Sequence, residues 1–443
     1  MGPTRGQAPR RIPPSMKRHS HALLRAALPA ATFLFLAGCT TVPHPSAAPD
    51  ALPKDPFADA LAPDPEAHVA KALAPLVERG TLPGAVSIVC DGDRTEVSCL
   101  GYADVAAKRP ITLDDAYMQC SQTKGFCGVT AAILVEEGKL SLDDPVSKYL
   151  PEFKTLWVLV GETNGVRTLR RAGNELTVRM CLNHMGGFPF EIPAKQRSIP
   201  GGGWSGGMPV RSVAATAAAQ PLLFEPGTQT KYSNTGIDIA AAVVQTIAGE
   251  PWDRFLQERV LDPLGMTETR FKPTKEQIAG HVEMYTVDKD GVAAYREQND
   301  WEQRPYDGDH VFPSAGAGLW TTARDQVKFY RMLMNGGVGD NGARILKEET
   351  VRGLLATTSR PAGFANYSLG LNASEDGRGW FGHGGAWGTN CQVDMERRRL
   401  KLWAVQISGD NRPWEKERAA AEDAFFAEAL DRTDETAYTG RTE

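Results

Sequence analysis

Ser121 and Lys124 stand three residues apart, at the start of a helix expected over residues 121–137. Residues at positions i and i+3 share one face of a helix, so the hydroxyl and the amine can meet. The positive end of the helix dipole disfavours an ammonium and burial acts in the same direction, so a neutral Lys124 can accept the Ser121 proton. Backbone N–H groups at this end also suit an oxyanion. The pattern predicts a nucleophilic serine, although a helix-capping Ser followed by a solvated Lys has the same spacing.

Tyr232 and Asn234 form a second candidate pair. They follow the turn Glu225-Pro226-Gly227 and precede a helix expected over residues 235–248. In extended backbone, residues two apart point the same way. A phenol can relay a proton, and an amide can both donate and accept a hydrogen bond. The alternative is a plain helix entry with Asn234 as its N-cap.

A third candidate is the segment His383-Gly384-Gly385-Ala386. Glycines allow a backbone to approach a ligand closely, and a strand edge there can supply an oxyanion-binding N–H. The alternative is a Gly-rich turn between two strands.

The order and spacing of these three segments resemble the serine β-lactamase/penicillin-binding-protein superfamily, specifically its class C β-lactamase-related serine hydrolases of the esterase-like branch. The second segment follows the first by about 110 residues and the third follows about 150 later. The likeness covers nearly all of residues 66–430. Further matching stretches are residues 134–145, 182–187 (where Gly replaces the family's Ser), 224–227, 263–266 and 318–325.

The resemblance implies that Ser121 is the nucleophile and is acylated by the substrate. Lys124 and Tyr232 would share the general-base and proton-relay work, and which of them takes the first proton stays open. Asn234 would orient the substrate carbonyl or Lys124. The oxyanion hole would be the backbone N–H groups of Ser121 and Ala386.

The third segment departs from the family pattern. His383 occupies the position usually held by Lys in K-T-G, and Gly384 replaces the hydroxyl-bearing Thr, while Gly385 is kept. Penicillins and D-Ala-D-Ala peptides carry a carboxylate, for which a partly charged His and a Gly form a weak anchor. We therefore expect an ester, or an amide without that anchor, as substrate. A D-Ala-D-Ala carboxypeptidase or D-peptidase and a β-lactamase are the alternatives.

Two other interpretations compete. Ser205, in Gly203-Trp204-Ser205-Gly206-Gly207, fits the G-x-S-x-G pattern of α/β-hydrolases, but that pattern requires a strand–turn–helix context, and we expect a loop here. The other competing interpretation is a non-catalytic cell-wall-binding lipoprotein. The joint presence of Ser121, Lys124 and Tyr232 argues against it, because binding needs none of them together. His184 is expected to be a buried structural residue of its loop.

The hydrophobic periodicity predicts an α+β fold. Helical spacing covers residues 66–80, and a turn at residues 91–94 separates two β-branched runs of a hairpin. Strands return at residues 392–395 and 400–407, before a last helix over residues 413–430. These elements predict an antiparallel sheet built from both termini and flanked by helices (residues 66–118 and 308–432), with a mostly helical insertion (residues 119–307) and a tail (residues 433–443).

The N-terminus reads as a targeting signal. A basic stretch precedes a 13-residue apolar run over residues 26–38, too short to span a bilayer. Leu36-Ala37-Gly38-Cys39 resembles a bacterial lipobox, which predicts that residues 1–38 are a signal peptide and that Cys39 carries a membrane anchor. Residues 39–65, with seven prolines from residue 40 on, are predicted to form an extended tether. We therefore expect an exported lipoprotein of the bacterial cell envelope; if the cell is Gram-negative, Thr40 after the Cys implies the outer membrane, facing the periplasm.

Charge and cysteine content narrow the choice of partners. Residues 1–38 hold six Lys and Arg and no acidic residue, which leaves the mature chain with 43 basic and 54 acidic residues, a net charge of −11. Such a chain has no general attraction for nucleic acid. The eight histidines are scattered, so no metal and no cofactor are predicted. Cys90 and Cys99 flank the hairpin turn and are expected to be able to face each other across it, whereas Cys120 and Cys127 are too far apart to bridge.

Overall fold

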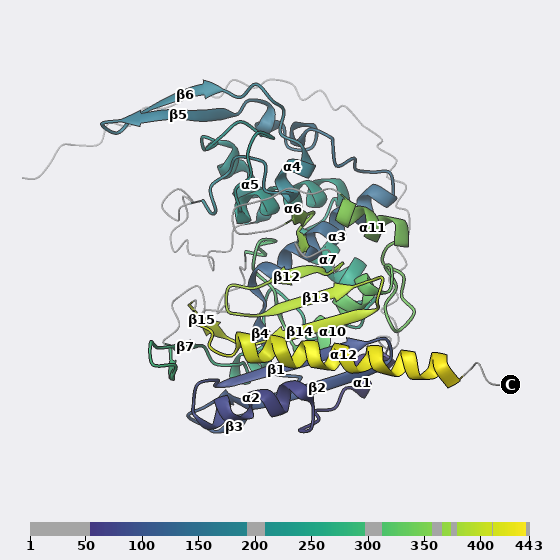
Figure 1. The fold of residues 1–443 in the computed structure, drawn as a ribbon. Helices are drawn as coiled ribbons and strands as arrows, with labels where there is room; N and C mark the ends of the chain where they lie inside the picture. Colours follow the sequence, from purple (N-terminus) through teal and green to yellow (C-terminus); the bar gives the residue numbers. More distant parts are fainter. Residues whose placement is uncertain are drawn as a thin grey trace, which may run out of the picture. The chain divides into compact units, whose positions relative to one another are not determined.

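The computed structural model describes residues 54–192, 209–296, 312–356, 366–373, 379–409 and 411–439 (Figure 1). The predicted signal peptide, Cys39 and the rival nucleophile Ser205 lie outside these ranges.

The main sheet of the described residues has eight strands, in the order β10-β11-β12-β13-β14-β1-β2-β3, and every neighbouring pair is antiparallel. Its strands are β1 (Gly84–Asp91), β2 (Arg94–Asp104), β3 (Arg109–Pro110), β10 (Asn366–Ser368), β11 (Leu371–Ala373), β12 (Phe381–Gly384), β13 (Asn390–Asp394) and β14 (Arg399–Ala404). Strand β14 pairs with β1, with Ile88 opposite Leu402, so the two ends of the chain share one sheet, and the predicted α+β fold is confirmed.

Helices cover the sheet. The run from Ala85 to Cys90 is buried without a break, as expected of a central strand with both faces covered. Helix α12 (Glu415–Thr439) packs on β1 and on α2 (His68–Glu78), and Figure 1 shows it in front of the sheet. Helix α10 (Ala323–Met334) packs on β13 and β14. The sheet is thus a buried layer that holds β12 in a fixed place.

Helix α3 (Thr123–Glu136) connects the sheet layer to the helical region. It follows a 3₁₀ turn, η1 (Cys120–Gln122), and is buried on nearly all sides, with Phe126 stacked on Phe329 of α10 at a ring-centroid distance of 3.7 Å. Helix α6 (Asn234–Ala248) packs on α3 and ends at Gly249, whose φ of 75° is the left-handed conformation that suits a helix end.

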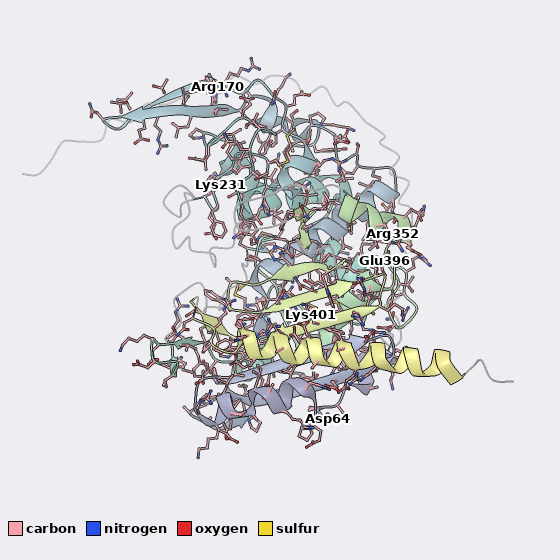
Figure 2. The ribbon with its side chains drawn as sticks, viewed as in Figure 1. Asp64, Arg170, Lys231, Arg352, Glu396 and Lys401 are labelled. Atoms are coloured by element: carbon pink, nitrogen blue, oxygen red, sulfur yellow. The ribbon has the colours of Figure 1, made fainter. Side chains whose placement is uncertain are left out.

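The predicted helical insertion also contains strands. A two-stranded hairpin of β5 (Trp157–Thr163) and β6 (Val166–Arg171) carries exposed Arg170 (Figure 2), and β7 (Tyr285–Val287) and β8 (Ala293–Tyr295) join β15 (Ile407–Ser408). The other helices described in this region are α4 (Val178–Leu182), α5 (Val210–Ala218), α7 (Trp252–Leu256) and α8 (Lys275–Ala279), with short turns η2 (Val146–Lys148), η3 (Pro151–Lys154) and the π-helical η5 (Gln257–Leu261).

Further contacts join this region to the sheet. Strand β4 (Tyr117–Met118), just before η1, pairs with β9 (Trp320–Thr321), just before α10. On α11 (Glu348–Ala356), Arg352 forms an ion pair of 2.5 Å with Glu396, in the turn between β13 and β14 (Figure 2). In the described part of the chain, no helix combines the length and apolarity needed to cross a bilayer.

Both ends of the folded part extend further than the sequence predicts. Helix α1 (Pro56–Ala60) lies inside the predicted tether, where Asp55 caps it and Ala58 is fully buried. The tether prediction is therefore wrong from Asp55 on, because Pro56 at the first helical position favours helix entry rather than extended chain. At the other end, α12 continues to Thr439, into the predicted tail.

The expected facing of Cys90 and Cys99 is also wrong. In the β1–β2 register Cys90 lies opposite Thr95, and Cys99 lies opposite Val86. The turn at residues 91–94 is tight, with Asp91 directly opposite Arg94, so the two cysteines sit four rows apart along the ladder and remain free thiols.

Candidate active site

Ser121 lies in η1, immediately before α3. Cys120 before it has a φ of 51°, an uncommon value for a residue with a side chain, and it turns the chain sharply between β4 and the helix. Lys124 follows one helical turn later, is fully buried, and places Nζ 3.0 Å from Ser121 Oγ. The predicted pairing of hydroxyl and amine is therefore present.

The Lys124 amine has two further neighbours, and they decide its chemistry. Nζ donates to Asn234 Oδ1 at 2.6 Å and to the Gly316 carbonyl at 2.6 Å. Neither oxygen can donate a hydrogen bond, so a neutral amine uses both of its protons on them. Its lone pair then points to the third neighbour, Ser121 Oγ. This geometry lets a neutral Lys124 accept the Ser121 proton, and Tyr232 also forms a hydrogen bond with Ser121.

The orientation of Asn234 is fixed from both sides. Its Nδ2 donates to Glu191 Oε1 at 3.1 Å, which leaves Oδ1 facing Lys124. The N-cap of α6 is Ser233, whose hydroxyl accepts from the Gly236 amide, and not Asn234. Because Ser233 satisfies the helix end, the Asn234 side chain serves the site instead.

Burial sets the charge of Lys124. Desolvation lowers the pKa of the ammonium to about 7, while the negative charge of Asp238 acts in the opposite direction. A lysine with this pKa is substantially neutral near pH 7, as a general base must be.

Tyr232 lies over the same group. Its ring centre is 4.5 Å from Lys124 Nζ. Burial raises the pKa of the phenol well above its usual range, and a hydrogen bond with Ser121 opposes this shift. Tyr232 therefore stays protonated. It can donate this proton to one group while it accepts a proton from another, so it can act as a proton relay.

His383 on β12 is buried and neutral. Burial, reinforced by the Lys124 charge, lowers its pKa to about 3. Its Nδ1 lies 2.6 Å from the Gly384 carbonyl, which only accepts, so Nδ1 carries the proton. Its Nε2 is then the acceptor for Tyr367 at 3.1 Å and for Tyr232 at 3.4 Å. The expectation of a partly charged His383 is wrong, and this residue offers no cation to a substrate.

His184 packs against the aromatic side chains of the site. It is buried, its Nδ1 accepts from the Ser233 amide at 3.2 Å, and its ring packs 4.4 Å from those of both Tyr232 and Tyr367. Burial holds its pKa well below the usual value. It packs as a structural histidine, as expected.

The turn after β12 closes on the nucleophile. Gly385 donates its N–H to Thr389, so this amide is engaged, whereas the Ala386 amide makes no hydrogen bond to any described residue. A Cβ on Gly385 would lie 2.5 Å from the Gln119 carbonyl, so the turn approaches the segment before Ser121 as closely as only glycine allows. The predicted oxyanion pair, Ser121 and Ala386, thus borders one cleft.

That cleft has a volume of roughly 730 Å³. It is lined by Ser121, Phe190, Tyr232, Asn372, His383, Gly384, Gly385, Ala386, Gly388, Thr389, Asn390, Gln392, Trp403, Arg412, Glu415 and Arg418. Ser121, Tyr232, His383, Gly385 and Ala386 meet here, with Lys124 and Asn234 directly behind Ser121.

Sequence reasoning missed the residues behind the site. Gln122 Nε2 donates to the His383 carbonyl at 2.9 Å and ties the nucleophile turn to β12. Glu191 and Gly316 hold Asn234 and Lys124. In the sequence, only the Gln beside Ser121 and the Gly-rich run at 316–318 stand out. Neither has a spacing that predicts a hydrogen bond to His383 or to Lys124.

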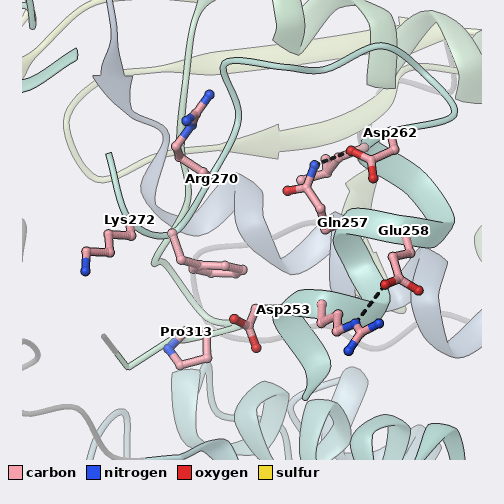
Figure 3. A pocket seen from close by; sticks show the side chains of 10 residues that line it. Asp253, Gln257, Glu258, Asp262, Arg270, Lys272 and Pro313 are labelled. Atoms are coloured by element: carbon pink, nitrogen blue, oxygen red, sulfur yellow. Dashed lines mark hydrogen bonds and ion pairs between the residues drawn. The ribbon is translucent and has the colours of Figure 1, made fainter. Parts of the chain in front are cut away.

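A second cavity, of roughly 530 Å³, lies among α7, η5 and residues 270–272 (Figure 3). Most of its polar side chains are paired with one another, as Gln257 is with Asp262 and Arg254 is with Glu258. It contains none of the predicted site residues. In the described ranges, no three His, Cys, Asp or Glu side chains are grouped to hold a metal.

Known proteins share this sequence pattern. The sequence model of the Beta-lactamase family matches residues 69–425. Protein Rv1367c of Mycobacterium tuberculosis is 30% identical over 369 residues, covering 75% of this chain and 88% of the relative. Lovastatin esterase of Penicillium rubens is 27% identical over 384 residues, covering 75% of this chain and 92% of the esterase. A putative D-alanyl-D-alanine carboxypeptidase of Escherichia coli is 27% identical over 277 residues, covering 59% and 60%.

Solved structures share the fold. A simvastatin synthase mutant from Aspergillus terreus superposes with a TM-score of 0.67 at 23% identity, covering 84% of this chain and 99% of that one. EstCE1, a hydrolase with promiscuous acyltransferase activity, gives a TM-score of 0.63 at 22% identity, covering 80% and 98%. At these identities the likeness is one of fold.

Proposed function

Because the chain belongs to the Beta-lactamase family, we propose that it is a serine esterase that works through an acyl-enzyme on Ser121. The observation that carries the proposal is the buried Lys124 amine, 3.0 Å from Ser121 Oγ and bound on two other sides to oxygens that only accept. Non-catalytic binding does not require a desolvated lysine directed at a serine hydroxyl.

Acylation begins when Ser121 Oγ attacks the ester carbonyl. The Ser O–H bond breaks, its proton moves to Lys124 Nζ, and the new O–C bond leaves an oxyanion facing the Ser121 and Ala386 amides. Collapse expels the alcohol. Tyr232, beside both Ser121 and Lys124, gives its proton to the leaving oxygen and takes one from the Lys124 ammonium.

Deacylation uses the same groups in reverse. A water molecule loses a proton through Tyr232 to Lys124 and attacks the acyl carbon. The Ser121–acyl bond then breaks, and Lys124 returns the proton to Ser121 Oγ. The carboxylic acid leaves, and every group regains its starting charge.

We infer the substrate class from β12. A neutral, buried His383 and a Gly384 without a side chain give a carboxylate no partner at the position of K-T-G. A neutral ester needs no such anchor. The relative named lovastatin esterase supports this choice.

One observation favours a second candidate, a D-Ala-D-Ala carboxypeptidase or D-peptidase. Arg412 lines the cleft, and its buried Nε has no hydrogen-bond partner among the described residues. Its Nη2 donates to the Ala386 carbonyl at 3.5 Å. Guanidinium groups bind carboxylates well. The putative D-alanyl-D-alanine carboxypeptidase among the relatives supports this alternative.

Purified protein assayed with short-chain p-nitrophenyl esters, nitrocefin and D-Ala-D-Ala peptides separates these functions. We expect the highest kcat/KM for an ester. A higher kcat/KM for nitrocefin than for every ester contradicts the proposal. Release of D-Ala at a higher kcat/KM than any ester, lost in Arg412→Gln, establishes the second candidate instead.

The reason for the preference is tested by restoring the anchor with His383→Lys and Gly384→Thr. A Cβ at position 384 would lie 3.5 Å from Thr389 O and 3.9 Å from Asn390 Oδ1, both ordinary contact distances, so Thr fits there. A charge-assisted hydrogen bond contributes roughly 1.5–3 kcal/mol, or about 10- to 150-fold. We expect kcat/KM for nitrocefin to rise relative to p-nitrophenyl butyrate by up to this factor. An equal change for both substrates places the cause elsewhere in the cleft.

A further inference from the structure

We propose that Asp238 is the positioning residue and counter-charge for Lys124: it fixes the backbone of Gly316, whose carbonyl binds the amine, and it stabilises the ammonium that forms when Ser121 loses its proton. This inference rests on the proposed role of Lys124 as base in the function above. Asp238 touches neither Ser121 nor the cleft and acts through the groups in front of it.

Asp238 stands on α6, one helical turn after Asn234, and only 3% of it is exposed. Its Oδ1 accepts from Ser314 Oγ at 3.1 Å and from the Gly316 amide at 3.2 Å. Partners that donate favour an ionised carboxylate, which can only accept. Among the described residues Asp238 has no ion-pair partner within contact distance, so this buried charge is balanced only from further away.

The backbone of Gly316 connects Asp238 to Lys124. Its N–H, in the peptide bond with residue 315, points to the carboxylate, and its carbonyl, in the next peptide bond, accepts from Lys124 Nζ at 2.6 Å, so this residue is held between the two side chains. A Cβ at position 316 would lie 2.7 Å from the Cβ of Asn234. The segment is therefore pressed against the residue that binds the other side of Lys124, and moving it disturbs both hydrogen bonds.

Of the titratable groups that face Lys124, Asp238 exerts the largest effect. It raises the pKa of Lys124 against desolvation more than Cys120, Glu191 or Cys127 do. Glu191 stands behind Asn234, and burial raises the pKa of Cys127 and of Tyr232. His184 and His383, across the site, are held neutral by burial and by the Lys124 charge. Burial raises the pKa of Asp238 to about 7, so it is ionised only above neutral pH.

The charge matters at the step that creates an ammonium. When the Ser121 O–H bond breaks and the Nζ–H bond forms, a buried neutral amine becomes a buried cation, which is costly without an opposite charge. An anionic Asp238 offsets that cost without contacting Ser121. A purely structural carboxylate would support the fold but would not change the pH at which Lys124 becomes a base.

The test is the rate at which a fluorophosphonate probe labels Ser121 as a function of pH, normalised to the total labelled at completion. This readout needs no substrate, so absent ester hydrolysis refutes the proposed function without touching the inference. In Asp238→Asn, which can keep the hydrogen bonds, we expect the acid limb to move down by about one pH unit and the plateau rate to fall roughly tenfold. Asp238→Ser, also neutral, should shift the limb in the same direction.

Asp325→Asn is the matched control. Asp325 is also buried on a helix, but it pairs with Lys328 at 2.8 Å. Its loss should lower the melting temperature and leave the acid limb in place. An unmoved limb in Asp238→Asn, or an equal shift in Asp325→Asn, overturns the proposal.

Discussion

At the scale of single residues, the site is governed by how the protons of one amine are used. Lys124 has three polar neighbours, and two of them can only accept. The third is the Ser121 hydroxyl, so the neutral amine has one direction left in which to accept a proton. Spacing alone predicts the Ser–Lys pair, but the direction of transfer depends on Asn234 and Gly316.

The pH dependence of hydrolysis follows from these groups. Lys124 is a base only when neutral, and burial lowers its pKa to about 7, so kcat/KM should rise through an apparent pKa near 7 and stay level above it. Asp238 has a pKa raised to about 7, so the limb belongs to the pair. The pKa of His383, lowered to about 3, lies below this range, and that of Tyr232 is raised above it. A pH–rate profile between pH 5 and 9 checks this, and activity that is highest at pH 5 contradicts it.

Ser121 and Lys124 should also act as a unit. Ser121→Ala removes the acyl-enzyme, and Lys124→Ala leaves a hydroxyl with no base, so each alone should cost most of the activity. The double variant should then be about as slow as either single one, as measured by kcat/KM for p-nitrophenyl butyrate. Additive losses would mean that the two groups work independently, and wild-type turnover in Ser121→Ala would make Ser205 the next candidate nucleophile.

At the scale of elements, the site depends on how closely the turn after β12 approaches η1. Thr389 Oγ1 donates to the Gln119 carbonyl at 3.4 Å, and Gln122 Nε2 donates to the His383 carbonyl at 2.9 Å. These bonds hold the Ala386 amide and Ser121 at the same cleft although the two residues are far apart in the sequence. The geometry of the predicted oxyanion hole is thus a property of the sheet–helix contact.

Gly385→Ala tests this contact. Its Cβ would lie 2.1 Å from Thr389 Oγ1 and 2.5 Å from the Gln119 carbonyl, so the turn must move. Overpacking of this kind typically costs about 1–3 kcal/mol of folding free energy. We expect the fractional loss in kcat to exceed the fractional loss in the free energy of unfolding. Gly353→Ala, on α11 with nothing within 4 Å of the new Cβ, is the control and should leave kcat nearly unchanged, with stability the same or up to about 1 kcal/mol higher because Ala favours a helix interior over Gly. Urea titration and kcat measurement decide, and unaltered kcat in Gly385→Ala refutes the assignment.

At the scale of the whole molecule, the two ends of the chain form one sheet. Strands β1 and β14 lie side by side, and α1, inside the predicted tether, packs on α10. Any tether to Cys39 is therefore the stretch before Asp55. The membrane anchor remains a prediction from the sequence.

Palmitate labelling tests the anchor. If Cys39 is the lipidated first residue of the mature protein, cells grown with radiolabelled palmitate should label the wild type and not Cys39→Ala. The reason is that the lipid anchor requires the thiol of this residue. Equal labelling of both proteins, or of neither, removes the claim. Labelled wild type in the outer-membrane fraction would support the sorting inferred from Thr40.

The sequence by itself predicted the sheet shared by both parts of the chain and the candidate residues of the site. Apolar periodicity identified α2, the β1–β2 hairpin and α6 to within a few residues, because these elements bury one face or all faces. Ser121, Lys124 and Tyr232 were proposed because three segments, in this order and at this spacing, resemble one superfamily.

Only the tertiary structure decided the charges and the partners. The neutrality of His383, the orientation of Asn234 by Glu191 and the place of Asp238 behind Gly316 all depend on groups far away in the chain. Burial and hydrogen bonding set these properties, and neither is encoded in a local pattern. The misjudged facing of Cys90 and Cys99 has the same origin, since register is fixed by the turn and by what the sheet packs against.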